Sequence, residues 1–343
     1  MSAISGNRRS RCRAAGGLER GFTILEMLVA SAVFMLLMGI LLTTVAQTGS
    51  VTQRAGDKIS AFQGARAAFD LLTATLSQAT LNTYWDFYDS NGKSASDPAY
   101  NGIPKRYGRQ SELHFLVGNA GAVPFPGTAG TGQAVFFQAA VGQSTAAASR
   151  GLQELLNVCG YYIQYAAVES LPSAFPGTST GGYRYQLMQE IEPSEDMSVY
   201  DTTAGNAWVK ASSPVPVAEN VIYLAIWPRK SPLDDPAGDD LTSDYSYDSR
   251  AGAAADPQLG TAHQMPPVVQ VTMVVIDEAS ASHLCTGNTP PQKVADAFSG
   301  LFGTSEKAQH EQDLKDMEAR LGAAGINHRV FTAMIPIRES RME

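Results

Sequence analysis

Charged residues are scarce in this chain. Asp, Glu, Lys and Arg make up 17% of the 343 residues, compared with about 25% in an average soluble domain. Glycine and proline, with 31 and 18 residues, are near their usual levels. This composition excludes a disordered chain and a coiled coil. The length allows one large domain or two ordinary ones, with enough chain to bury a core.

Motifs of nucleotide-binding proteins and metalloproteases are also missing. The chain has no complete Walker loop, no dinucleotide fingerprint and no H-E-x-x-H. The histidines lie far apart without metal-ligand spacing, so we expect no zinc site. They are His114, His263, His283, His310 and His328.

The net charge of −8 argues against a chain that coats nucleic acid or an anionic membrane, and we expect no nucleic-acid partner. This charge is distributed unevenly. Residues 1–21 hold five arginines against the single Glu19, a local charge of +4 that leaves −12 for the other 322 residues. The positive charge therefore lies at the amino-terminal end.

A long apolar run follows this basic segment. Residues 22–46 contain one ionisable side chain, Glu26, and as a helix they would extend about 38 Å, enough to cross a hydrocarbon core of about 30 Å. The apolar core of a secretory signal peptide is shorter. The arginines before the run and the acidic sequence beyond it predict a single span with a cytoplasmic amino terminus and the bulk of the chain on the outer side of the membrane.

Placing the Glu26 carboxylate within a membrane span costs free energy, so we expect it to have a function and a positively charged partner. The string RGFTILEMLVA at residues 20–30 resembles the prepilin-type processing motif of type IV pilins and type II secretion pseudopilins. The resemblance implies cleavage by a prepilin peptidase between Gly21 and Phe22, followed by N-methylation of Phe22. Glu26 would then neutralise the new amino-terminal ammonium of a neighbouring subunit. The alternative is an uncleaved single-span membrane anchor in which Glu26 has no function.

The same resemblance implies three kinds of partner: the prepilin peptidase, other pilin or pseudopilin subunits, and an inner-membrane assembly platform. Many pilins have a helix-bending proline in this segment, whereas no proline precedes Pro98 here. A kink in the helix is therefore not predicted.

The predicted organisation has four parts. Residues 1–21 form a leader that is removed, residues 22–46 a transmembrane helix, residues 47–83 an amphipathic helix that continues from it, and residues 84–343 a β-rich external domain. The amphipathic stripe has helical spacing and consists of Ile59, Phe62, Phe69, Leu72 and Leu76. A separate second helix after a break near Gly49 or Gly56 is the alternative.

Short apolar runs between Gly-, Pro- and Ser-rich stretches predict strands in the external domain. These are residues 112–117, 134–139, 158–166, 183–191, 221–227, 268–276 and 329–337. Two helical stretches are predicted between the last two strands, and the stronger covers residues 306–321. The predicted fold class is α+β and pilin-like, with a long amino-terminal helix packed on an antiparallel β-sheet domain.

Two more specific resemblances concern the external domain. The strand at residues 268–276 after Pro266 and Pro267, together with the strand end at Trp227 and Pro228, is similar in order to minor pseudopilins of the J type. The whole chain is similar to the cassette protein C family of Verrucomicrobia and relatives. In that family the first helix ends in a stretch like residues 69–85, and the last strand resembles residues 328–338.

Residues 234–248 form an acidic loop with six aspartates and no basic residue. Clustered carboxylates suit calcium, although the loop lacks EF-hand spacing and a solvated surface loop is the alternative. The candidate ligands are Asp234, Asp235, Asp239, Asp240 and Asp244.

Cysteine is rare, with three residues in the chain. Cys12 would leave with the leader, so the exported part would hold Cys159 and Cys285. An oxidising periplasm allows a disulfide between them, and two buried free thiols are the alternative.

The sequence as a whole predicts a pilin-like structural subunit, a minor pseudopilin, and not an enzyme. No cofactor is expected, and calcium at the acidic loop is the alternative. A membrane-anchored periplasmic binding or enzymatic domain with a prepilin-like signal is the competing interpretation.

Overall fold

The computed structural model describes most of the chain after the basic segment. The described residues are 23–122, 124–127, 132–149, 151–152, 154–168, 182–201, 205–252, 260–340 and 342. The chain consists of two compact units, Met1–Gly56 and Asp57–Glu343.

The first unit contains the start of helix α1 (Ile24–Leu76). Thr23 caps this helix, because its Oγ1 accepts a hydrogen bond from the Glu26 backbone N–H at 3.2 Å and its carbonyl oxygen accepts one from the Met27 N–H at 3.2 Å. The segment Ile24–Val45 has a mean hydropathy of 2.4, and it is long and apolar enough to cross a membrane. Its side chains are exposed. The helix has no break at Gly49 or Gly56.

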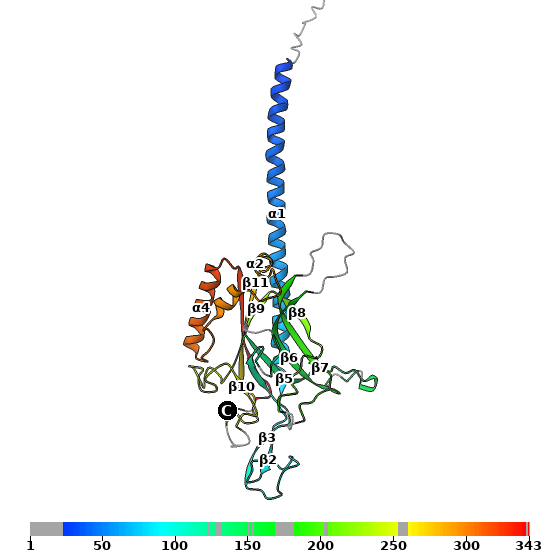
Figure 1. Ribbon diagram of the computed structural model, residues 1–343, viewed down its shortest axis with the longest axis vertical. Coiled ribbons are helices and arrows are strands. Elements are labelled where there is room, and N and C mark those ends of the chain that lie inside the picture. The colour runs from blue at the N-terminus through cyan, green and yellow to red at the C-terminus, as the bar shows by residue number, and fades with distance from the viewer. Residues whose placement is uncertain are drawn as a thin grey trace, which may run out of the picture. The chain divides into compact units, whose positions relative to one another are not determined.

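The described residues of the second unit form three antiparallel sheets (Figure 1). The largest has the strand order β10-β4-β5-β6-β7-β8, with β1 paired to β5, and the second has the order β12-β11-β9. The third is the hairpin β2-β3. The strands are β1 (Ala79–Thr80), β2 (Tyr84–Tyr88), β3 (Arg106–Gln110), β4 (Leu116–Asn119), β5 (Gln133–Ala140), β6 (Leu156–Ala167), β7 (Tyr183–Glu192), β8 (Val215–Glu219), β9 (Val221–Arg229), β10 (Tyr247–Asp248), β11 (Val268–Ile276) and β12 (His328–Pro336).

Three short helices lie between β11 and β12 in the chain: α2 (Glu278–Leu284), α3 (Gln292–Phe298) and α4 (Lys307–Ala323). A single turn of 3₁₀-helix, η1 (Ala147–Ser149), precedes β6. Helices α3 and α4 pack on one face of the three-stranded sheet. The ring of Phe298 stacks on Tyr223 of β9 at 4.1 Å between centroids, and His310 of α4 lies 5.1 Å from the ring of Trp227. This face of β9 is therefore closed off from solvent.

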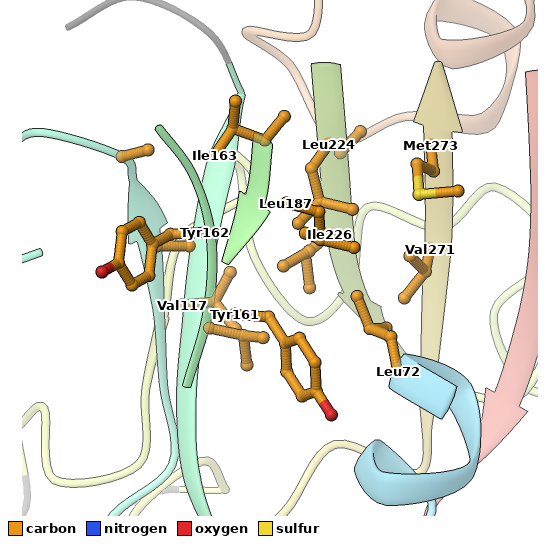
Figure 2. Close-up of a cluster of buried hydrophobic side chains, with 14 of the residues drawn as sticks. Leu72, Val117, Tyr161, Tyr162, Ile163, Leu187, Leu224, Ile226, Val271 and Met273 are labelled. Atoms are coloured by element: carbon orange, nitrogen blue, oxygen red, sulfur yellow. The ribbon is translucent and has the colours of Figure 1, made fainter. Parts of the chain in front are cut away.

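The part of α1 in the second unit packs into the main hydrophobic core. Leu72 and Leu76 are fully buried, and the ring of Phe69 lies 5.9 Å from that of Phe331 on β12. Figure 2 shows Leu72 next to the core residues of both larger sheets, including Tyr161 of β6 and Val271 of β11. The domain thus packs on one face of the helix, as the amphipathic stripe predicts. The side chain of Ile59 lies outside the described part.

The α+β fold class is confirmed, with an amino-terminal apolar helix and a mostly antiparallel sheet domain. Six of the seven predicted strands have their counterparts in β5, β6, β7, β9, β11 and β12, and α4 corresponds to the stronger predicted helix.

The prediction for residues 112–117 is wrong over its first four positions, because the strand β4 begins only at Leu116. The backbone N–H groups of three residues before it donate to side chains rather than to a neighbouring strand. The Leu113 N–H donates to Ser111 Oγ, the His114 N–H to Gln138 Oε1, and the Phe115 N–H to Ser249 Oγ.

Candidate functional site at the amino-terminal helix

Glu26 lies in the first turn of α1, two residues after the helix begins. A carboxylate is favoured there because the amino-terminal end of a helix carries a partial positive charge. The side chain is exposed, and among the described residues no basic group forms an ion pair with it. The helix thus presents one carboxylate in an apolar segment with room for a partner from outside the chain.

Gly21 and Phe22, the predicted cleavage site, lie outside the described residues. Cleavage between them would make Phe22 the first residue and Glu26 the fifth. The roles of Gly21, Phe22 and Glu26 stay predictions.

An α+β protein with one apolar amino-terminal helix and a single carboxylate near its start fits the architecture of a pilin-like protein. Residues 18–42 match the family model of the prokaryotic N-terminal methylation motif. The chain therefore carries a prepilin-type cleavage and methylation signal, and a single-pass membrane anchor is compatible with it. Comparison with curated proteins and with solved structures gave no match. The resemblances to J-type pseudopilins and to the cassette protein C family stay predictions.

The acidic loop brings three of its five candidate ligands together. Carboxylate oxygens of Asp235, Asp239 and Asp240 lie within 4.8 Å of one another, and Asp234 and Asp244 are not part of this group. Asp235 is buried, and its two oxygens accept hydrogen bonds from the backbone N–H groups of Gly238 at 2.7 Å and Asp240 at 3.2 Å. The carboxylate of Asp235 therefore stabilises the backbone of residues 235–240 without a bound cation.

Two cations lie close to this acidic group. The Lys230 ammonium is 3.6 Å from the carboxylate of Asp240, and the buried Arg229 guanidinium donates to the Asp235 carbonyl oxygen at 3.4 Å. Both compete with a bound divalent cation. Hydrogen bonds and ion pairs within the loop account for this arrangement, and calcium binding stays a prediction.

The two cysteines of the sheet domain are free and buried, which is the alternative of two buried free thiols rather than a disulfide. The Cys285 thiol contacts the hydroxyl of Tyr165, whereas Cys159 lies six residues away from Tyr165 on the same strand, β6. Six residues of strand extend about 20 Å, while a disulfide requires Cα atoms within about 7 Å. The structure therefore has two separate thiols, and burial raises the pKa of Cys159 to about 12.

A buried histidine that pairs with a half-buried aspartate lies beside β4, and no motif in the sequence points to it. His114 Nε2 is 2.6 Å from Asp248 Oδ1, and the Trp208 indole N–H donates to His114 Nδ1 at 3.1 Å. With Nδ1 accepting, the proton lies on Nε2 and faces the carboxylate. Both ring nitrogens are engaged within the domain, and burial lowers the pKa of His114. The two hydrogen bonds of His114 therefore link the residues before β4 to β10 and to the segment around Trp208.

Proposed function

We propose that the chain is a minor pseudopilin, a structural subunit of a type II secretion pseudopilus or a type IV pilus-like filament, and not an enzyme. The observation that carries this proposal is the methylation-motif match at residues 18–42, on a helix whose apolar segment contains one carboxylate, Glu26.

In this proposal, assembly begins with processing. A prepilin peptidase cuts between Gly21 and Phe22, removes the +4 leader and leaves Phe22 as an N-methylated amino terminus. The leader arginines hold the amino terminus in the cytoplasm, and the sheet domain faces the periplasm.

Glu26 then pairs with the Phe22 ammonium of a neighbouring subunit at the inner-membrane assembly platform. Two opposite charges attract strongly in a low-dielectric helix bundle, whereas either charge alone is penalised. The pair therefore selects the register between neighbouring helices, and the apolar segment Ile24–Val45 supplies the packing surface.

The substitution Glu26→Gln tests this proposal, because it removes the charge and keeps the size of the side chain. We expect processing to continue and incorporation into filaments to fail. Ser31→Ala is the matched control, since the Ser31 hydroxyl donates to the Leu28 carbonyl oxygen within its own helix, and this variant should assemble normally. Gly21→Ala should block cleavage. A membrane-anchored binding or enzymatic domain, the alternative function, predicts that Glu26→Gln changes neither processing nor the location of the chain.

A further inference from the structure

The hairpin β2-β3 carries a row of exposed aromatic rings. Trp85, Phe87 and Tyr107 are 55%, 51% and 49% exposed. Phe87 pairs directly with Tyr107, and Trp85 pairs with Arg109, so these side chains share one face of the hairpin. The Tyr107 ring lies 5.2 Å from Trp85, with 17° between the planes, and 5.2 Å from Phe87. Figure 1 shows the hairpin at one end of the sheet domain.

A cavity of about 420 Å³ adjoins this row at Trp85, within the range of about 300–1,000 Å³ for small-molecule sites. Its walls include Trp85, Arg109, Gln264, Met265 and Glu339.

Two hydrogen bonds hold these walls in place. Arg109 Nε donates to the Ala262 carbonyl oxygen at 3.2 Å, and Ser340 Oγ donates to the Met265 carbonyl oxygen at 2.9 Å. The second bond fixes the chain next to Glu339. The cavity therefore has an aromatic wall and positioned polar groups, which together are typical of a ligand site.

Gln264 is the most informative of the lining residues. It is 9% exposed, and its Oε1 has no hydrogen-bond partner among the described residues. A buried polar atom without a partner costs free energy, and such atoms are rare in folded proteins. Oε1 itself is enclosed by protein, so a turn of the Gln264 amide toward the cavity, with a hydrogen bond donated by a ligand, would remove this cost.

The lining groups indicate the chemistry of the ligand. Gln264 Oε1 and the Glu339 carboxylate are acceptors, and the Arg109 guanidinium is a donor, so the ligand must bring groups that donate as well as accept, as hydroxyls do. Trp85 offers a flat apolar face next to them. A nucleic acid does not fit, because its phosphates would meet Glu339 in a chain that carries a net charge of −8. A pyranose ring supplies both hydroxyl donors and an apolar C–H face.

We propose that this cavity binds a pyranose unit of a neutral oligosaccharide, which packs on Trp85 and donates hydroxyl hydrogen bonds to Gln264 and Glu339. Tyr107 and Phe87 support the indole of Trp85 by extending its stack along the hairpin. The proposal is independent of processing and assembly at the amino terminus.

Tryptophan fluorescence can test this site selectively, because Trp208 and Trp227 are each 1% exposed while Trp85 is exposed. The full chain is titrated with cellotetraose and with tetra-N-acetylchitotetraose, in a detergent without a sugar headgroup. We expect a saturable change in emission and protection of Trp85 from acrylamide quenching.

Calorimetry on variants identifies the groups responsible. Trp85→Ala should weaken binding at least about tenfold, and Gln264→Leu and Glu339→Ala should weaken it about two- to tenfold each. Tyr200→Ala is the matched control, because Tyr200 is an aromatic residue of similar exposure, 53%, that does not line this cavity, and it should bind normally. Unchanged emission of the buried tryptophans in Trp85→Ala shows that the variant is folded.

Three results would overturn the proposal: no protection of Trp85 by either oligosaccharide, equal affinity of Trp85→Ala and the parent chain, or protection by an aromatic peptide alone. The last result would assign the surface to a protein partner instead.

Discussion

Two buried histidines of the sheet domain, His263 and His310, have pKa values well below the usual range for histidine because of their burial. His310 of α4 is 2% exposed, and its ring lies 5.1 Å from that of Trp227. Its Nε2 accepts from the Gln270 amide at 3.2 Å, and its Nδ1 bonds with the Tyr245 hydroxyl at 2.7 Å. Burial is the main cause that lowers the pKa of His310 from 6.5 to about 4; the nearby Arg229 lowers it further, and Asp313 opposes the shift. Protonation would turn Nε2 into a second donor that faces the Gln270 amide.

We therefore predict that the free energy of unfolding is steady above pH 6.5 and falls as the pH drops from about 6.5 to 4. In that window His310 is protonated in the unfolded chain but neutral in the folded chain. Below pH 4 this difference lowers the free energy of unfolding by about 3 kcal/mol. His263, whose pKa burial also lowers to about 4, acts in the same window.

Urea unfolding at several pH values measures this dependence. His310→Gln should make the pH dependence shallower, and an unchanged pH profile in that variant would contradict the role of His310.

The cysteines give a second prediction at this scale. Alkylation under denaturing conditions without reductant should modify both Cys159 and Cys285, because the two residues lie too far apart to pair. Under native conditions both should react slowly, because both are buried and only the thiolate is reactive. Mass spectrometry reads both results, and a species two hydrogen masses lighter that resists alkylation would refute the assignment.

Among the elements, the part of α1 in the second unit should contribute strongly to the stability of the sheet domain. Leu72 is fully buried, whereas its neighbour Leu71 is 42% exposed. Leu72→Ala should lower the free energy of unfolding by about 2–5 kcal/mol, through lost burial and a cavity. Leu71→Ala, the matched control on the same turn, should cost far less. Denaturant unfolding of the full chain measures both, and equal effects would contradict packing of this face of the helix into the core.

Local patterns predict the long strands and α4 well. The run of β-branched residues in β11 specifies a buried strand by itself, and its predicted bounds agree with those of the structure. The seven-residue helices α2 and α3 are too short for periodicity to define them. The capping of α2 is visible only in the structure, where Asp277 Oδ1 accepts from the Ser280 N–H at 2.8 Å. The hairpin β2-β3 was missed because the string YWDFY at residues 84–88 has no apolar–polar alternation.

The two candidate sites also differ in how well the sequence alone predicts them. The motif around Glu26 is contiguous in sequence, so reading the sequence finds it. The cavity beside Trp85 draws on residues 109, 264 and 339 as well, and no local pattern connects these positions. Exposed aromatic residues at 84–88 were the available signal, but burial has to be known before they can be told from core residues.

For the molecule as a whole, the charge separates into two parts that meet at the predicted cleavage site. The first 21 residues carry +4 and the remaining 322 carry −12. If the leader is removed, the protein that assembles is strongly acidic, with one apolar helix to hold it in a membrane or in a filament core. The few charged residues of the chain are thus almost entirely absent from the segment that would pack between subunits.

The mass of the amino-terminal peptide from chains recovered in a purified filament fraction tests the central claim most directly. Processing and assembly together predict a peptide that begins at Phe22 and carries one methyl group on its nitrogen. A chain that is absent from filaments, or that is found there with residues 1–21 still attached, would contradict the account.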